Sequence, residues 1–301
     1  MNLQFKTYHD DNYNEVCQFL IDISQEHRKH INWNWARWEW MYFHPDFDRS
    51  LRSKIGLWFD ELELVGLATY DHYSGEAFFA TKQGYEELED EIVEYAVKTF
   101  SDENGLGVAV NDTDSERSQR LQNKGFVKHD QSENIVACSI ANIEHHSVLP
   151  AGITLKSLDA ETDVYKHKTV LWKGFDHDGP VPIDDVTIQK QKAMLSATHM
   201  NPSLHIVAVN EDGEYVAYCG LWYSPQTDYA YVEPVVTIPS YRGMGLGAAV
   251  VVEALKRSSV LGANKAYVIS DHLFYKAIGF VQHSRYSFYW HNDLRTAIRN
   301  V

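Results

Sequence analysis

Three glycines alternate with other residues at Gly243, Gly245 and Gly247, after a strand-like run that ends near Thr237. Residues 246–260 have the apolar spacing of an amphipathic helix, so the glycines lie at a strand-to-helix turn. Amides in the first turn of a helix have no partner inside the helix and lie at the positive end of its dipole, so they bind anions. Glycine lets the main chain approach phosphate oxygens, and Arg242 adds a cation. This turn is typical of a diphosphate site.

Two familiar phosphate loops do not fit this segment. A P-loop ends in Gly-Lys-Ser or Gly-Lys-Thr, and this turn does not. A dinucleotide loop is followed about 20 residues later by an acidic residue that holds a ribose, and none stands there. Alternating glycines are weak evidence alone, because glycine also serves ordinary turns and helix packing.

A second motif lies about 30 residues further on, Phe274-Tyr275-Lys276-Ala277-Ile278-Gly279-Phe280. In this order and spacing, the two motifs resemble the GNAT superfamily of acyl-CoA-dependent N-acyltransferases. The resemblance covers residues 153–291 by motif, and residues 2–141 only by element order and the ending Lys124-Gly125-Phe126. It implies an α/β protein of two tandem GNAT-like domains, each a mixed, mostly antiparallel twisted sheet flanked by helices.

The resemblance implies acetyl-CoA as the cosubstrate and assigns the residues that bind it. The strand 232–237 would separate from its parallel neighbour and pair through its main chain with pantetheine. Pro234 supports this, because proline cannot donate to a sheet and predicts an interruption beside it. The expected contacts are Val235, Val236 and Thr237 for pantetheine, and Arg242, Gly243, Met244, Gly245, Leu246, Gly247 and Ala248 around the diphosphate.

Direct acyl transfer from a thioester requires a neutral amine, a stabilised oxyanion and a proton for the departing thiolate. Glu233 precedes the loop where several family members have a carboxylate that removes the ammonium proton, commonly through water. The competing interpretation is a partly buried acid paired with arginine or a backbone group. Tyr275 matches the family tyrosine that acts as general acid near the sulfur, or it is a core residue. The amide of Val235 or Val236 would bind the oxyanion.

One departure from the family pattern concerns the pantetheine arm. Many members place an asparagine about two turns before the tyrosine, whereas this chain has Val268 within a strand and then Ser270-Asp271-His272. We expect Asp271 to be the N-cap of the following helix and not a ligand.

The acceptor site is expected in the segment 171–180. Trp172 and Phe175 could line an amine pocket by cation–π contact, and Asp178 or Asp176 could pair with an ammonium group. The alternative is that the aromatic residues cover an edge of the core. Asp176-His177-Asp178 has no second ligand cluster in the sequence, so no metal site is expected.

The two halves of the chain have similar patterns and predict two domains, 1–147 and 148–301, with a linker near residues 145–152. In the first half, the counterpart of the glycine loop is Lys82-Gln83-Gly84-Tyr85-Glu86-Glu87, whose two carboxylates would repel a diphosphate. The first domain is therefore expected to be degenerate, and one acetyl-CoA is expected to bind, in the second domain. Four tryptophans within residues 32–42 predict a packed helix or a domain interface, with an aromatic lid as the minority interpretation.

Composition excludes several classes of protein. The 27 basic and 42 acidic residues give a net charge of −15, which argues against nucleic-acid binding. The first half holds 13 basic and 27 acidic residues, so the acidity belongs there and serves solubility or attracts a cationic amine. No apolar run is long enough to span a membrane, and no secretory signal precedes the first strand, so a cytoplasmic monomer or homodimer is expected. The cysteines Cys17, Cys138 and Cys219 are expected to be buried free thiols.

These patterns together predict an N-acetyltransferase that transfers an acetyl group from acetyl-CoA to the amine of a small molecule in a ternary complex, and the acidic charge balance permits a cationic amine. Two alternatives stay open. One is acetylation of a protein N-terminus or lysine, which would need an open peptide groove, and the other is a non-catalytic acyl-CoA sensor.

Overall fold

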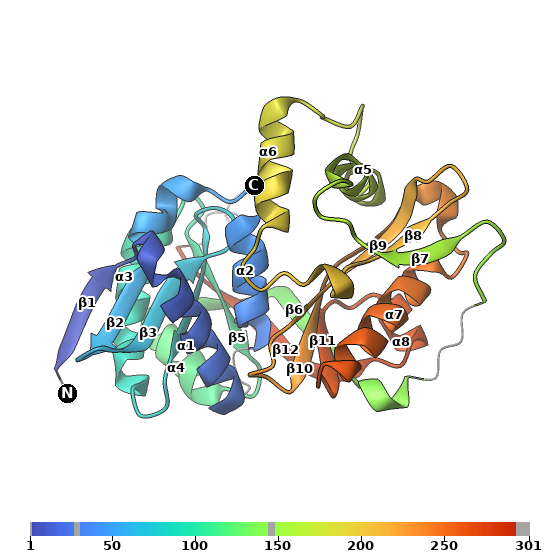
Figure 1. Cartoon of the computed structure of the whole chain (residues 1–301). Helices are drawn as coiled ribbons and strands as arrows, with labels where there is room; N and C mark the ends of the chain where they lie inside the picture. The colour runs from blue at the N-terminus through green and yellow to red at the C-terminus, as the bar shows by residue number, and fades with distance from the viewer. Residues whose placement is uncertain (1, 27–30, 144–147, 293–301) are drawn as a thin grey trace, which may run out of the picture. The chain divides into compact units, whose positions relative to one another are not determined.

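The computed structural model describes residues 2–26, 31–143 and 148–292 (Figure 1). The chain divides into two compact units. The first consists of Met1–Met41, Asp46–Asn134 and Ser284–Val301, and the second consists of Tyr42–Pro45 and Ile135–His283.

The same order of elements occurs twice along the chain. The first half contains β1 (Leu3–Thr7), α1 (Tyr13–Glu26), α2 (Trp35–Phe43), β2 (Gly56–Asp60), β3 (Glu63–Tyr70), β4 (Glu76–Thr81), α3 (Glu89–Phe100), β5 (Leu106–Asn111), α4 (Ser115–Asn123) and β6 (Val127–Ser139). The second half contains β7 (Thr154–Ser157), α5 (Val164–Gly174), α6 (Asp185–Leu195), β8 (Ile206–Val209), β9 (Tyr215–Tyr223), β10 (Tyr229–Thr237), α7 (Leu246–Val260), β11 (Lys265–Ile269), α8 (Leu273–Ala277) and β12 (Val281–His291). The predicted internal repeat is therefore present. Within the described residues, no helix is long and apolar enough to cross a membrane.

In the second unit, the strand order is β6-β11-β10-β9-β8-β7, and β10 and β11 are the parallel pair. Helix α7 packs against β8, β9 and β10, and its buried side chains join one apolar core. A second core lies between the sheet and the helices α5 and α6. The two helical layers thus cover opposite faces of the sheet, and the turn between β10 and α7 follows the carboxyl end of an interior strand.

In the first unit, the strand order is β1-β2-β3-β4-β5-β12. Helices α1 and α3 pack against β3. Trp35 and Trp38, on α2, are completely buried, which confirms the predicted packed helix in this tryptophan-rich segment.

The two halves of the chain exchange their last strands. Residues Lys265–Ile269 of β11 pair with Ser139–Ile135 of β6, a strand from the first half of the chain. Reciprocally, Tyr286–His291 of β12 pair with Asn111–Leu106 of β5 in the first unit. A boundary at residue 147 separates the two sets of elements along the chain, but each unit completes its sheet with the final strand of the other half.

Candidate functional site

Strands β10 and β11 separate after a short parallel contact. Their pairing covers only Tyr229–Tyr231 against Lys265–Tyr267, although β10 continues to Thr237. Against β9, the register of β10 shifts by one residue between Val232 and Val235, and the Glu233–Pro234 peptide bond in this bulge is cis. The interruption predicted beside Pro234 is therefore confirmed.

The separation leaves specific amides available at the open edge of β10. Ile238 donates its amide to the carbonyl of Val216 on β9, and Val236 lies opposite Tyr218 in the same register. Because successive amides of a strand point to opposite edges, Val236 also faces β9. The amides of Val235 and Thr237 consequently point away from β9, toward the opening.

The loop between β10 and α7 has the conformation that glycine permits. Gly243 and Gly245 have φ values of 77° and 79°, in the left-handed region that other residues rarely adopt. A Cβ atom at either position would meet no heavy atom within 4 Å, so backbone conformation, and not space, requires glycine there. Helix α7 begins directly afterwards at Leu246 and has no acidic residue in its first turn, which leaves its positive end uncompensated by side chains of that turn.

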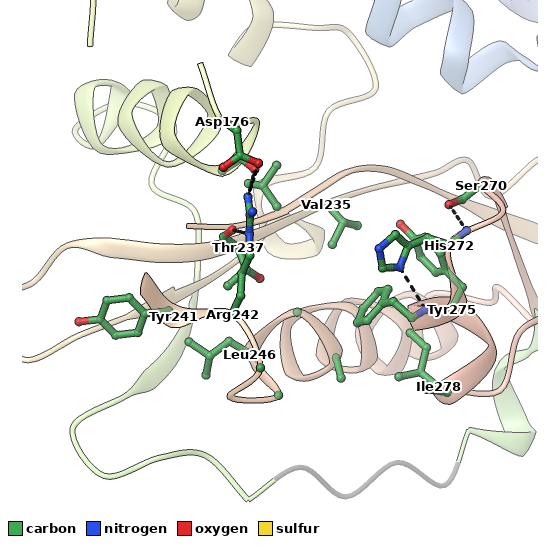
Figure 2. A pocket seen from close by; sticks show the side chains of 18 residues that line it. Asp176, Val235, Thr237, Tyr241, Arg242, Leu246, Ser270, His272, Tyr275 and Ile278 are labelled. Atoms are coloured by element: carbon green, nitrogen blue, oxygen red, sulfur yellow. Dashed lines mark hydrogen bonds and ion pairs between the residues drawn. The ribbon is translucent and has the colours of Figure 1, made fainter. Parts of the chain in front are cut away.

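A cavity of about 680 Å³ lies between the separated strands and the start of α7 (Figure 2). It is lined by Gly174, Asp176, Val235, Val236, Thr237, Tyr241, Arg242, Gly243, Gly245, Leu246, Gly247, Ala248, Ser270, His272, Phe274, Tyr275, Ala277 and Ile278. Every residue predicted to contact acetyl-CoA lines this cavity except Met244, whose side chain is 48% exposed.

The guanidinium of Arg242 is engaged within the protein. Its Nη2 lies 2.8 Å from Asp176 Oδ2 and 2.9 Å from the carbonyl of Gly174, and its Nε donates to the carbonyl of Thr237 at 3.0 Å. Figure 2 shows Arg242 directed at Asp176. The side chain of Arg242 thus connects the glycine loop between β10 and α7 to the C-terminal end of α5, a contact that spacing in the sequence did not indicate.

Tyr275 lies in the cavity wall on α8. Its ring packs edge-to-face against Phe274 and Phe280, and only 8% of the residue is exposed. Burial raises the pKa of its hydroxyl well above the ordinary value, and the nearby Cys219 and Glu233 add to the rise. The hydroxyl therefore stays protonated at neutral pH and can donate a proton or a hydrogen bond.

Ser270, Asp271 and His272 stand shortly before Tyr275, in the segment where many GNAT members have an asparagine that this chain lacks. Ser270 and His272 both line the cavity, and sequence reasoning assigned neither. The N-cap of α8 is His272, whose Nδ1 accepts the amide of Phe274 at 3.2 Å, so the prediction of Asp271 as N-cap is wrong. His272 lies one residue closer to the helix than Asp271. The prediction missed it because N-cap preferences favour short polar side chains over histidine.

Glu233 is half-buried and lies at the bulge, outside the set of cavity-lining residues. Its Oε2 accepts a hydrogen bond from the hydroxyl of Tyr231 at 2.6 Å. Its main-chain carbonyl accepts one from the indole of Trp222 at 2.9 Å. Both the side chain and the backbone of Glu233 are therefore held by aromatic residues.

The three residues proposed for the acceptor do not line the cavity. Trp172 stacks on His177 with ring centroids 4.5 Å apart and donates to the carbonyl of Gly179 at 3.3 Å. Phe175 is 51% exposed, and Asp178 is exposed. Their neighbours Gly174 and Asp176 do reach the cavity, because α5 ends against β10, where a Cβ on Gly174 would lie 2.6 Å from Val236 Cβ.

The corresponding region of the first unit is filled. Strands β4 and β5 pair in parallel only over Glu76–Ala77, so they also separate, but Trp33 stacks on Phe78 at 4.1 Å in the gap and the remaining cavity measures about 10 Å³. At the loop, both carboxylate oxygens of Glu86 accept the amide of Gly84, at 3.1 and 3.0 Å. In the first unit, side chains thus fill the gap between these strands, and a carboxylate bonds the amide of Gly84.

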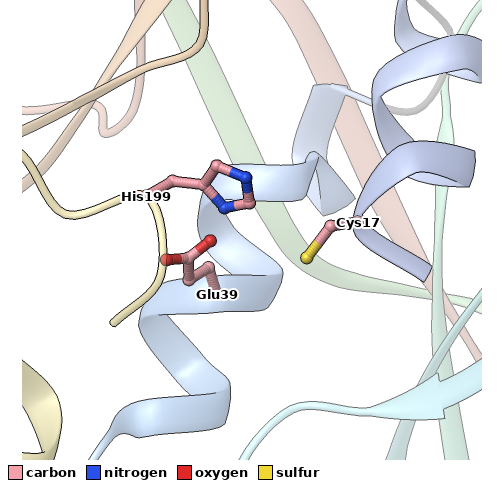
Figure 3. A group of neighbouring side chains, drawn as sticks. All are labelled: Cys17, Glu39 and His199. Carbon is pink, nitrogen blue, oxygen red and sulfur yellow. The ribbon is translucent and has the colours of Figure 1, made fainter. Parts of the chain in front are cut away.

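The cysteines are buried and form no disulfide, as predicted. Figure 3 shows Cys17 of α1 and Glu39 of α2, both inside the first unit. Burial, with a contribution from Glu39, raises the pKa of the Cys17 thiol to about 12. The thiol is protonated at neutral pH, which disfavours a nucleophilic role for Cys17.

Comparison with known proteins agrees with this geometry. Residues 168–283 match the family model described as "Acetyltransferase (GNAT) family". A GCN5-related N-acetyltransferase from Sphaerobacter thermophilus has a similar structure, with a TM-score of 0.62 and 12% identity over 96% of this chain and 95% of that one. A tandem GNAT protein from the clavulanic acid biosynthesis pathway aligns with a TM-score of 0.58 and 13% identity, over 95% of this chain and 97% of that one. At these identities the structures establish the shared fold alone. We found no significant match among curated proteins.

Proposed function

We propose that this chain, whose residues 168–283 match the GNAT acetyltransferase family model, acetylates the amine of a small molecule by direct attack in a ternary complex. The observation that carries the proposal is the cavity between β10 and β11. It combines outward amides at Val235 and Thr237, a left-handed glycine loop and the protonated hydroxyl of Tyr275.

The residues present fit acetyl-CoA. The Thr237 amide suits the pantetheine arm, and the turn Gly243–Gly247 at the start of α7 suits the diphosphate. A cavity of about 680 Å³ is within the usual range for small-molecule and cofactor sites. Bound acetyl-CoA supplies the activated acetyl group.

In the proposed reaction, the Glu233 carboxylate accepts a proton from the ammonium form of the acceptor, directly or through water. The neutral nitrogen attacks the thioester carbon, and the Val235 amide donates a hydrogen bond to the carbonyl oxygen as it gains negative charge. Of the two amides considered from sequence, Val235 is the one directed away from β9. The Tyr275 hydroxyl donates its proton to the sulfur as the carbon–sulfur bond breaks. The attacking nitrogen, which carries one extra proton after the attack, releases it to solvent, and solvent returns a proton to the Tyr275 oxygen.

A cationic acceptor is favoured by the side chains near the C-terminal end of α5. The exposed Phe175 and the stacked Trp172 flank Gly174 and Asp176, which form one side of the cavity. Aromatic faces and carboxylates in this segment suit a cationic amine.

The proposal is tested by thiol release from acetyl-CoA over a panel of small amines, aminoglycosides, and peptides with free N-termini or lysines. We expect release with at least one small amine and none with the peptides. Tyr275→Phe is expected to lower turnover about 10- to 100-fold and to leave acetyl-CoA affinity within about twofold, because it removes only a proton donor. Acetyl-CoA binding without thiol release from any acceptor would contradict catalysis and favour a sensor.

The filled first unit predicts one acetyl-CoA per chain in isothermal titration calorimetry. Glu86→Gln is expected to leave this stoichiometry at one, because Trp33 and Phe78 still fill the gap between β4 and β5. Gly245→Val in the second unit should weaken binding strongly, since a β-branched residue does not tolerate the left-handed conformation. Two equivalents bound by the unaltered chain would refute the assignment.

A further inference from the structure

Glu233 shares one face of β10 with Tyr231. Val232, between them, belongs to the core beneath α7, so its two neighbours point to the opposite face. Trp222 lies opposite Tyr231 in the register of β9 and contacts the ring of His205, which also contacts Tyr218 of the core under α5 and α6. Glu233 therefore lies on the face covered by α5 and α6, the helices that flank the expected acceptor segment.

Tyr231 is rigidly placed on that face. It is completely buried and belongs to the short parallel contact with β11, where it lies opposite Tyr267. Its hydroxyl reaches two residues along the strand to Glu233 Oε2, at 2.6 Å. A phenol donates a stronger hydrogen bond to an ionised carboxylate than to a neutral carboxyl group, so the contact favours the ionised form of Glu233.

The backbone of Glu233 is held independently of its side chain. Trp222 donates to the Glu233 carbonyl, and Gly220 leaves room for it, because a Cβ at Gly220 would lie 2.5 Å from that carbonyl oxygen. Removing the Tyr231 hydroxyl therefore leaves this backbone contact of the bulge in place.

We propose that Tyr231 is a positioning residue for Glu233: its hydroxyl fixes the carboxylate at the bulge and maintains its proton-accepting form. The inference rests on the proposed function, in which Glu233 is the general base. It assigns to a buried tyrosine of the strand a part in the reaction that neither motif of the chain contains.

The test compares Tyr231→Phe with Tyr229→Phe, a matched control that removes a buried tyrosine hydroxyl from the same strand. In the pH profile of kcat/KM for the acceptor, Tyr231→Phe is expected to move the acidic limb upward by about one pH unit. The acetyl-CoA KM should stay within twofold. Tyr229→Phe should leave the limb in place. An unshifted limb in Tyr231→Phe, or an equal shift in both variants, would overturn the inference.

A second readout does not depend on activity. Carbon-13 NMR of protein labelled at glutamate Cδ, with Glu233→Gln to assign the resonance, follows the titration of Glu233 itself. We expect a higher pKa for Glu233 in Tyr231→Phe than in the unaltered chain and in Tyr229→Phe. If no amine is acetylated, the proposed function fails while this titration still decides whether Tyr231 stabilises the ionised carboxylate. An unchanged titration refutes the role of Tyr231 even in an active enzyme.

Discussion

Glu233→Gln is expected to lower kcat about 10²- to 10⁴-fold near neutral pH, the range typical for removal of a general base. Glutamine has nearly the same shape and can still accept the hydroxyl of Tyr231, and Trp222 bonds the main chain, so the local fold should persist. The side-chain amide of glutamine cannot accept a proton from an ammonium ion, so the acceptor would have to lose that proton to solvent.

The decrease in kcat should become smaller as the pH approaches the pKa of the acceptor amine, because a growing fraction of the acceptor is then neutral without transfer of a proton to Glu233. The measurement is kcat for thiol release as a function of pH, with acetyl-CoA affinity from calorimetry expected to stay nearly unchanged. Glu253→Gln, on α7 in an ion pair with Arg257, is the matched control and should keep full activity. A Glu233→Gln enzyme with the normal rate at neutral pH would contradict the assignment of the base.

Acidification from pH 7 to pH 5 is expected to destabilise the second unit through two buried histidines. His167 and His205 are completely or almost completely buried, and burial lowers the pKa of each imidazole from 6.5 to about 3. In the unfolded chain both histidines bind protons below about pH 6.5, whereas in the folded chain both stay neutral. The stability is therefore fully present above pH 6.5 and falls as the pH decreases toward 3, by roughly 1 kcal/mol per pH unit for each histidine.

The buried carboxyl group of Asp71 does not produce this effect in the same window. Asp71, whose pKa the Arg37 guanidinium lowers to about 2 against the opposing effect of burial, loses its contribution only in stronger acid. The net charge of −15 becomes smaller on acidification, which reduces repulsion and favours the folded chain. A decrease in stability between pH 7 and pH 5 therefore points to the imidazoles.

The urea midpoint, followed by circular dichroism at several pH values, measures this decrease. His205→Gln should reduce its slope by about half, because glutamine can still bond the Tyr218 hydroxyl but does not titrate. The exposed His177→Gln is the control, with an unchanged slope expected. A midpoint that is independent of pH over this range would show that the two histidines are protonated equally in both states.

Local patterns predicted the parts of the fold and site that depend on nearby residues. The turn after β10 was recognisable because alternating glycines and the absence of early acids reflect backbone conformation and helix electrostatics, both local properties. The bulge was predictable from Pro234 for the same reason. The start of α7 at Leu246 likewise agrees with the apolar spacing from residue 246 onward.

Contacts between distant segments were not predictable in this way. The amphipathic pattern of a strand such as β12 shows which face is buried but not which strand lies beside it, so the pairing with β5 was missed. Arg242 seemed directed at phosphate because its spacing fits, and its contact with Asp176 depends on where α5 ends against β10. The support of Glu233 by Trp222 and Tyr231 likewise requires the register of β9 against β10.

The reciprocal use of the final strands has a consequence for biosynthesis. The sheet of the first unit cannot be completed early in translation. Its strand β5 pairs with β12, which the ribosome makes after all the other described strands. During translation, β5 therefore presents an unsatisfied edge for most of the time needed to make the second half, and unsatisfied edges promote aggregation. If the two halves were made as separate chains, the edge of β5 would stay unpaired in the N-terminal fragment, and the C-terminal fragment would lack β6, the partner of β11.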